Sequence, residues 1–260
     1  MLKIDNITIS YKDNPVVRDF SLSMENGQII SLVGESGSGK TSVIRAVLGL
    51  LPLGGEVSKG DIILDGESLL AYSKDKWNQI RGTKISMIFQ DSGAMMNPTR
   101  KVESVFMEYI LTHEKISKKE AWNKAAKMLE RMNLPSVENV MKSYPFQLSG
   151  GMRQRVGIAM SMTYSPELLL ADEPTSALDV TTQAQIVRQM MELRDEYKTG
   201  IIMVTHNMGV AAYMSDYIIV MKDGKIVDEG DRNYVLKESK NDYTRTLIDA
   251  VPSMGGERYV

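Results

Sequence analysis

The sequence predicts an α/β fold in which a helical segment interrupts a set of buried strands. Apolar runs typical of buried strands occur at residues 29–33, 84–89, 168–173 and 200–205. Between about residues 91 and 163 the apolar residues instead recur at helical spacing. A glycine-rich turn follows the first run directly and leads into an amphipathic helix, which is the strand-turn-helix order of an α/β unit.

The composition is that of a globular chain. Of the 260 residues, 43% are hydrophobic and 25% are charged, and no run is long and apolar enough to span a bilayer. The first residues lack the charged and apolar regions of a signal peptide, so we expect a cytoplasmic protein that reaches a membrane only through a partner. A net charge of −2 does not favour nucleic-acid binding, and the lack of cysteine excludes disulfides and thiolate chemistry.

Residues 1–30 alternate apolar and polar residues and contain turn residues at 13–15 and 25–27, which predicts β-hairpin structure. Tyr11 lies at the end of the first run. A lone aromatic residue usually serves packing. With a nucleotide site nearby, it could instead stack on a purine, and both interpretations stay open.

The glycine-rich turn fits the pattern G-x-x-x-x-G-K-T, and we call it the cradle. It consists of Gly34, Glu35, Ser36, Gly37, Ser38, Gly39, Lys40 and Thr41, and Ser42 follows it. Glycines let successive N–H groups and the positive end of the helix dipole converge on anionic oxygens. Lys40 would add charge for the outer phosphates, and the Thr41 hydroxyl would ligate Mg²⁺. The alternative is a Gly/Ser connection that binds nothing.

Gln90 ends the predicted strand over residues 84–89. It is either an ordinary polar cap or, in a phosphate site, a ligand of Mg²⁺ or a holder of the attacking water. Further along, Ser117 and Glu120 form the pattern of a capping box at the start of a helix. The lysines of that helix indicate a solvated face rather than a nucleic-acid surface.

A second glycine-bearing helix start lies at Ser149, Gly150 and Gly151. Its free N–H groups could bind an anion, but no Lys-Thr pair follows, so it is not a complete nucleotide site. A simple capped helix explains the pattern equally well.

Two carboxylates, Asp172 and Glu173, end the predicted strand over residues 168–173. Unpaired buried charge is costly, so we expect Asp172 to hold Mg²⁺ or its waters and Glu173 to polarise the attacking water; the alternative is a solvated acidic loop. Asp179 precedes a helix and is explained by N-capping. His206 ends the strand over residues 200–205, on the same strand-end side as Lys40, Gln90 and Glu173, where open α/β sheets bind ligands.

Residues 217–227 predict a terminal hairpin with a turn at 222–225, and a helical tail follows to about residue 250.

Together these residues resemble, from end to end, the nucleotide-binding subunit of ATP-binding-cassette (ABC) transporters. By that resemblance the cradle is the Walker A motif, Gln90 the Q-loop, residues 148–152 the signature and residues 168–173 Walker B with its catalytic glutamate. Residues 176–179 are similar to the D-loop, which contains Asp179; His206 is similar to the switch histidine and Tyr11 to the adenine-stacking aromatic.

The resemblance implies a P-loop NTPase (RecA-like) core with an antiparallel β-subdomain and an inserted α-helical subdomain. The expected single domain, 1–260, divides into a catalytic lobe (1–90 and 164–230), a helical signature subdomain (91–163) and a short helical tail (231–260). The implied cofactors are ATP and Mg²⁺, with Thr41, Gln90 and Asp172 around the metal.

The resemblance also implies partners. One partner would be a second ATPase subunit, either a paralogue or another copy of the chain. Ser149, Gly150 and Gly151 would contact the ATP that this second subunit binds. Two integral membrane permease subunits would dock near Gln90 and the loop after it, and an extracellular solute-binding protein would join through them. The implied location is the cytoplasmic face of the membrane, and no nucleic acid is expected.

Within the family, residues 87–91, 148–155, 175–181 and 242–252 are similar to the peptide/nickel importer branch. The branch usually has Pro at Ser92, Asp at Asn207 and His-Pro at residues 241–242. The chain lacks cysteine and ends at Val260, which is similar to short nickel- or metallophore-type members.

The implied function is therefore ATP hydrolysis that energises import of a peptide, nickel or a metal chelate. An alternative is a soluble cassette ATPase working on DNA, ribosomes or cluster assembly. A chromosome-associated member would need long heptad arms between the cradle and the signature, and a ribosome factor would need two cassettes; the chain has neither. A nucleotide-binding scaffold with little turnover is a third possibility, against which Lys40, Glu173 and His206 argue.

Overall fold

The computed structural model describes residues 1–251, 253–254 and 257–258. The chain divides into two compact units, which we call unit 1 (Met1–Asn78 with Gly200–Val260) and unit 2 (Gln79–Thr199). Unit 2 therefore contains more than the helical subdomain expected over residues 91–163. The expected division into lobes stays a prediction.

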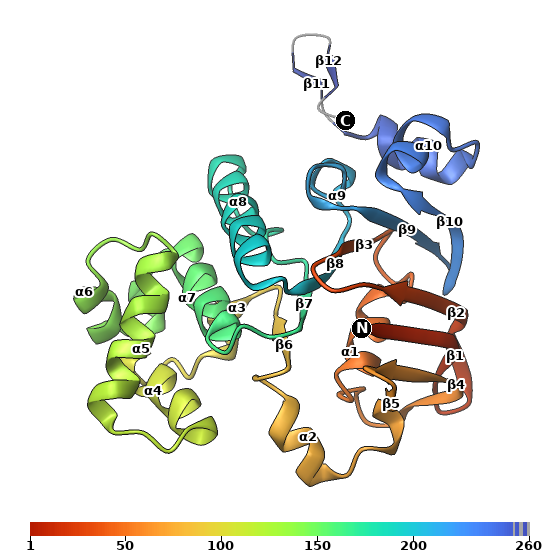
Figure 1. The fold of residues 1–260 in the computed structure, drawn as a ribbon. Helices are drawn as coiled ribbons and strands as arrows, with labels where there is room; N and C mark the ends of the chain where they lie inside the picture. The colour runs from red at the N-terminus through yellow and green to blue at the C-terminus, as the bar shows by residue number, and fades with distance from the viewer. Residues whose placement is uncertain (252, 255–256, 259–260) are drawn as a thin grey trace. The chain divides into compact units, whose positions relative to one another are not determined.

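Unit 1 contains an antiparallel sheet built from the N-terminal part of the chain. Its strands are β1 (Leu2–Tyr11), β2 (Asn14–Met24), β4 (Gly55–Leu64) and β5 (Glu67–Ser68), in the order β2-β1-β4-β5. Strand β1 pairs antiparallel with both β2 and β4, as Figure 1 shows. The predicted hairpin is thus confirmed, and Tyr11 is the last residue of β1.

A second group of strands in unit 1 is parallel and buried. Strand β3 (Ile29–Val33) pairs in parallel with β8 (Gly200–Thr205) and with β9 (Tyr217–Lys222), and β10 (Lys225–Asp231) pairs antiparallel with β9. Every residue of β3 and β8 is buried, as expected for parallel strands that are covered on both faces. Because the pairing is parallel, the carboxyl ends of β3, β8 and β9 lie at one edge.

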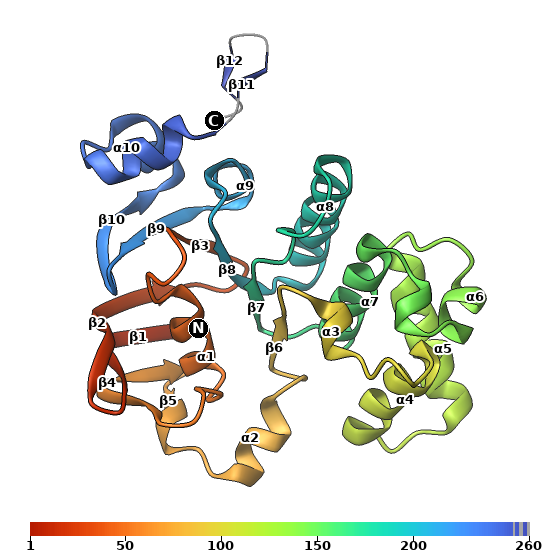
Figure 2. The ribbon, with the colours of Figure 1, turned by 180° about the vertical axis from the view of Figure 1, so that it is seen from behind.

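Short helices complete unit 1. They are α1 (Lys40–Val47), a 3-10 turn (Leu69–Ala71), α9 (Met208–Met214), a π-helical turn (Tyr234–Glu238) and α10 (Asp242–Asp249), while α2 (Lys74–Ile80) carries the boundary between the units. Helix α10 packs against α9 (Figure 2). The tail is helical to Asp249, which agrees with the helical tail expected to about residue 250; beyond it β11 (Ser253–Met254) pairs with β12 (Glu257–Arg258). Pro252, which lacks the N–H that a helix requires, precedes this pair.

Unit 2 combines two parallel strands with helices. Strand β6 (Ile85–Ile88) pairs with β7 (Leu168–Asp172). The helices are α3 (Ser92–Met95), α4 (Val102–His113), α5 (Lys118–Arg131), α6 (Val137–Lys142), a 3-10 turn (Pro145–Gln147), α7 (Gly150–Met162) and α8 (Val180–Tyr197). Helix α5 packs against α4, α6 and α7 (Figure 2). The helical character predicted for this part of the sequence is confirmed. Among the described residues, no helix has both the length and the apolar character needed to cross a bilayer.

The capping box predicted at the start of α5 is present. The Ser117 hydroxyl accepts a hydrogen bond from the Glu120 N–H at 3.3 Å, and the Glu120 carboxylate accepts one from the Ser117 N–H at 2.8 Å. The bonds from Ser117 to the carboxylate hold the pKa of Glu120 below its usual value. Two N–H groups that the helix leaves without an internal partner are thereby satisfied.

An aromatic cluster joins α4 to the end of α7. The ring centroids of Tyr109, His113 and Tyr164 lie 5.3–5.8 Å apart, and the ammonium of Lys124 lies 4.1 Å from the centroid of the Tyr164 ring. Burial lowers the pKa of His113, while the charge of Glu114 acts in the opposite direction. His113 thus favours its neutral form in the folded chain.

This shift predicts a loss of stability in acid. As the pH falls through about 6.5, the unfolded chain binds a proton at His113 before the folded chain does, so the free energy of unfolding decreases. We expect the Tm to fall between about pH 7 and about pH 5, and the fall to be smaller in His113→Gln. His206→Gln is the control, since His206 is exposed. Equal pH dependence in both variants would contradict this assignment.

Candidate functional site

In unit 1, the cradle is packed against its neighbours so closely that only glycine fits at two of its residues. A Cβ on Gly34 would lie 2.1 Å from the carbonyl oxygen of Met221, at the end of β9. A Cβ on Gly39, where φ is +98°, would lie 2.7 Å from Cγ2 of Val17 in β2. The backbone of the cradle is therefore braced on two sides.

Lys40, the first residue of α1, is buried and held inside the cradle. Its ammonium donates to the carbonyl oxygens of Gly34 at 2.7 Å and Glu35 at 2.6 Å, and to the Ser38 hydroxyl at 3.1 Å. An ammonium has three N–H donors, and these three acceptors all belong to the loop. The positive charge is thus fixed at the start of the helix, where the dipole also favours an anion.

The remaining cradle residues leave space for a ligand. A Cβ on Gly37 would have no heavy atom within 4 Å, and Ser36 is exposed. Thr41 is half-buried in the first turn of α1. Next to it, the Ser42 hydroxyl lies 3.4 Å from the hydroxyl of Tyr11. Tyr11 is therefore tied to the helix that begins in the cradle, and its stacking on a purine stays a prediction.

His206 lies at the same edge of the sheet as the start of the cradle. Val33 pairs with Thr205 in the parallel register of β3 and β8, so Gly34 and His206 both follow paired residues. The next residue, Asn207, caps α9 by accepting hydrogen bonds from the N–H groups of Gly209 and Val210 at 2.9 and 3.3 Å. Asparagine is as good an N-cap as aspartate, so capping explains this departure from the family pattern.

Unit 2 brings Gln90 and Glu173 together. Ile88 pairs with Ala171, so the carboxyl ends of β6 and β7 lie at one edge. The side-chain amide nitrogen of Gln90 lies 3.3 Å from a carboxylate oxygen of Glu173 and 3.3 Å from the Ser176 hydroxyl. Because the nitrogen donates to these groups, the amide oxygen is the atom of Gln90 suited to a cation.

Asp172 is the last residue of β7 and is only 8% exposed. Glu173 follows it with φ at +45°, in the left-handed region. This conformation costs about 1–3 kcal/mol for a residue other than glycine and is concentrated at functional sites. The strand thus ends at Asp172, and the strained conformation of Glu173 begins the turn that follows it.

The oxygen donors in these segments fit Mg²⁺. Mg²⁺ prefers hard oxygen ligands and is usually held by one or two carboxylates together with substrate phosphates. The Thr41 hydroxyl in unit 1, and the Asp172 carboxylate and Gln90 amide oxygen in unit 2, are such donors. Among the described residues, no group of three or more acidic, histidine or cysteine residues lies together.

The second glycine-bearing helix start is a capped helix, as one of the two predicted interpretations requires. The Ser149 hydroxyl accepts a hydrogen bond from the Met152 N–H at 3.2 Å. A Cβ on Gly151 would lie 2.7 Å from Cγ2 of Thr182, so packing against α8 explains this glycine. The nearest atom to a Cβ on Gly150 would be 3.8 Å away, and the residue is exposed. Packing within the described residues therefore does not explain Gly150.

Asp179 acts as the N-cap of α8, as predicted. Its carboxylate accepts hydrogen bonds from the N–H and the hydroxyl of Thr182 at 2.9 and 2.7 Å, and the bond from the N–H is the main reason why the pKa of Asp179 is lowered. Any further role for this residue remains a prediction.

Sequence reasoning missed Gln154. This glutamine in α7 is 4% exposed; its side chain accepts from the Ser92 N–H at 3.3 Å and donates to the Phe89 carbonyl oxygen at 3.4 Å. It therefore ties the helix that begins at Ser149 to the segment that carries Gln90. A signal exists in the sequence, since Gln154 precedes the buried Ile158 by four residues on one helix face.

Comparison with known proteins agrees with these features. The family model described as "ABC transporter" matches residues 17–176. The oligopeptide transport ATP-binding protein OppD of Bacillus subtilis is 38% identical over 259 residues, which cover 98% of this chain and 72% of that protein. The dipeptide transport ATP-binding protein DppD of Lactococcus lactis is 37% identical over 98% of this chain and 74% of its own length. OppD of Escherichia coli is 40% identical over 96% of this chain and 75% of its own length.

Among solved structures, the ATP-binding cassette MJ0796, in a dimeric post-hydrolysis state bound to ADP and Pi, superposes with a TM-score of 0.79. Its sequence is 28% identical, and the match covers 89% of this chain and 99% of that one.

Proposed function

Because the chain belongs to the ABC transporter family and is an ATPase of that family, we propose that it is the ATP-hydrolysing subunit of a peptide importer. Peptides are supported by the names of the relatives. These are oligopeptide and dipeptide transport ATP-binding proteins, and their similarity extends over 98% of this chain. Nickel or a metal chelate is the second candidate, and only features of the sequence favour it.

In this proposal unit 1 binds the nucleotide. The N–H groups of the cradle and the Lys40 ammonium receive the phosphates, and Tyr11 stacks on the adenine. Support comes from the open space at Gly37 and from the buried Lys40 ammonium, which would exchange one or more of its loop acceptors for phosphate oxygens. His206, which follows β8 at the same edge as the cradle, would contact the terminal phosphate.

Unit 2 activates the attacking water. Glu173 would accept a hydrogen bond from the water and polarise it, and the Gln90 amide nitrogen keeps the carboxylate oriented. Thr41, Asp172 and Gln90 would hold Mg²⁺, which neutralises charge on the phosphates when bound. Asp179 orders the start of α8, one turn beyond Ser176.

Ser149, Gly150 and Gly151 would serve the ATP of a second ATPase subunit, either a paralogue or another copy. The exposed helix start and the unexplained Gly150 support this role, since an anion could approach the backbone closely there. MJ0796, whose structure is dimeric, gives a precedent among solved relatives.

The permease subunits would dock on unit 2 beside the segment that follows Gln90. A cavity of about 210 Å³ lies there, lined mainly by apolar side chains that include Phe89, Met96 and Tyr109, and Met95, which also lines it, is 61% exposed. An apolar hollow of this kind can receive side chains of a partner. We place the chain at the cytoplasmic face of the membrane, where these permeases and, through them, a solute-binding protein are reached.

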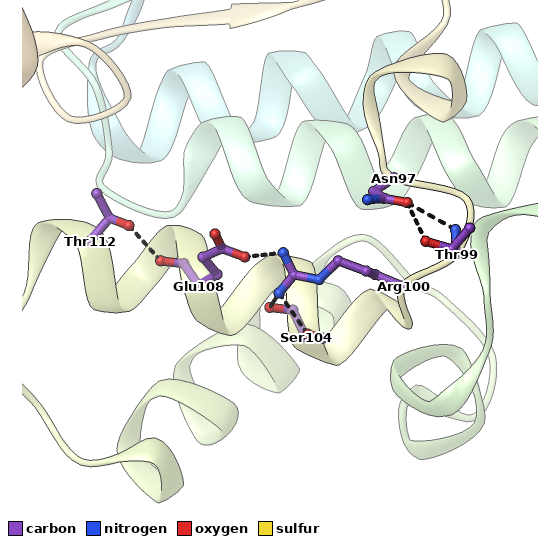
Figure 3. A network of polar contacts seen from close by, with 6 residues as sticks. All are labelled: Asn97, Thr99, Arg100, Ser104, Glu108 and Thr112. Carbon is purple, nitrogen blue, oxygen red and sulfur yellow. Dashed lines mark hydrogen bonds and ion pairs between the residues drawn. The ribbon is translucent and has the colours of Figure 1, made fainter.

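A polar network orders the segment before α4, which follows the cavity-lining Met96 in the chain. The Asn97 side chain accepts hydrogen bonds from the N–H and hydroxyl of Thr99 at 3.0 and 2.7 Å, and Arg100 donates to the Ser104 hydroxyl at 2.8 Å and pairs with Glu108 (Figure 3). These bonds would limit the conformations that the loop before α4 offers to a partner.

Purification from membranes in mild detergent tests the proposal. The chain is expected to elute with two integral membrane subunits, and uptake of a labelled peptide is expected to require it. The Glu173→Gln chain should assemble equally well but support no uptake. Recovery of ribosomal or DNA-repair proteins alone would reject a transporter, and uptake of nickel without uptake of peptide would reject the solute.

A further inference from the structure

The C-terminal tail contributes to the hydrophobic core that supports the cradle. Val33, the last residue of β3 before the cradle, belongs to a buried cluster with Val235 of the π-helical turn and Ile248 of α10. The partly buried Tyr243 and Leu247 pack against the same cluster. The tail is therefore part of unit 1's core and not an appendage of it.

Polar contacts fix α10 in one orientation against β10. Asn241 caps the helix by accepting from the N–H groups of Tyr243 and Thr244 at 3.0 and 3.1 Å, and it donates to the Val227 carbonyl oxygen at 2.9 Å. The Thr244 hydroxyl, which is fully buried, donates to the Asp228 carboxylate at 2.7 Å. A helix with a buried polar anchor on its inner face cannot rotate about its axis without breaking that bond.

This orientation brings Tyr243 to the cradle. The Tyr243 hydroxyl oxygen accepts a hydrogen bond from the Glu35 N–H at 2.9 Å, and the Lys222 ammonium lies 4.7 Å from the centroid of its ring. Burial raises the pKa of Tyr243, so the group acts as a neutral hydroxyl in the neutral pH range.

The peptide group between Gly34 and Glu35 is consequently held at both ends. Its oxygen, on Gly34, accepts from the Lys40 ammonium at 2.7 Å, and its N–H, on Glu35, donates to Tyr243 at 2.9 Å. Hydrogen bonds on the two sides of one peptide group polarise it cooperatively. One planar group thus connects the phenol of the tail to the ammonium of the cradle.

We propose that Tyr243 is a positioning residue for nucleotide binding, which acts on Lys40 through the Gly34–Glu35 peptide group. The inference rests on the proposed role of the cradle. Without the hydroxyl, the peptide group keeps its bond to Lys40 but loses the one to its N–H, so the Gly34 oxygen that orients the Lys40 ammonium is held less firmly. ATP then binds to a less ordered loop, and the entropy lost in ordering that loop weakens the binding.

The test is Tyr243→Phe in the full chain, which keeps the ring against the core and removes only the hydroxyl. One net hydrogen bond predicts a rise of about three- to tenfold in the Kd and KM for ATP, with kcat changed less than about twofold. Amide hydrogen exchange at Glu35 is expected to accelerate, and the Tm should stay within about 2 °C of the parent. Tyr234→Phe is the matched control, because no hydrogen bond joins Tyr234 to the cradle among the described residues.

Unchanged KM and Kd for ATP in Tyr243→Phe would overturn the proposal, as would a lower Tm with the same KM, which indicates a purely structural role. Lys40→Ala, measured alongside, separates the two levels of inference. Loss of ATP binding in Lys40→Ala with no effect of Tyr243→Phe rejects only the positioning role. Normal ATP binding in Lys40→Ala rejects the cradle and the positioning role together.

Discussion

Glu173→Gln is expected to lower steady-state ATP hydrolysis by about 10²–10⁴-fold, which is the usual contribution of a positioned general base. Glutamine has the shape of glutamate but cannot accept the proton of the attacking water. The Gln90 amide nitrogen, 3.3 Å from the carboxylate, would still find an acceptor oxygen on the new side chain, so the local structure should persist. Phosphate release under saturating ATP measures the effect.

Binding of ATP should survive this change, since no cradle residue is altered. ATP-dependent dimers are therefore expected to accumulate in Glu173→Gln, and size-exclusion chromatography would detect them. Glu167→Gln is the control, because Glu167 lies before the same strand and is exposed in an ion pair with Lys84 at 3.3 Å. Rapid turnover by Glu173→Gln, or equal loss in Glu167→Gln, would refute the assigned role of Glu173.

Local sequence patterns predicted most of the individual elements. The capping box at Ser117 and the caps at Ser149 and Asp179 depend on residues three positions apart, so the sequence contains all the information that these contacts need. The same holds for the strand before the cradle, whose five residues are all apolar or small and all buried. The motif predicts a tight turn at Gly34, but it does not predict that this glycine packs against Met221.

Contacts between distant segments could not be predicted in this way. Tyr243 is 208 residues from Glu35, and nothing in the tail pattern indicates that its hydroxyl meets the cradle. The bond from Gln90 to Ser176 joins residues 86 apart, and a short polar side chain in a loop carries no local signal of a tertiary partner. The first pair depends on how α10 docks against the core and the second on the pairing of β6 with β7, and neither arrangement is specified by a local pattern in one sequence.

Lys40→Ala is expected to raise the Kd for ATP by about 10²-fold or more. Charge-assisted hydrogen bonds are each worth about 1.5–3 kcal/mol, and a buried ammonium at a phosphate makes more than one of them. Part of the loss would come from the cradle itself. Lys40 joins the Gly34 and Glu35 carbonyl oxygens to the Ser38 hydroxyl, and without it the loop loses three internal hydrogen bonds. Calorimetric titration with ATP and Mg²⁺ measures the change.

The control for the Lys40 prediction is Lys84→Ala, which removes a half-exposed lysine from an ion pair with Glu167 and should leave the Kd for ATP unchanged. A second substitution separates the loss of the charge from the loss of order in the cradle. Lys40→Met retains the length of the side chain without its charge, so ATP affinity as weak as in Lys40→Ala would assign the loss to the charge. Undiminished ATP affinity in both Lys40 variants would instead show that the cradle does not receive the phosphates, whatever its sequence pattern.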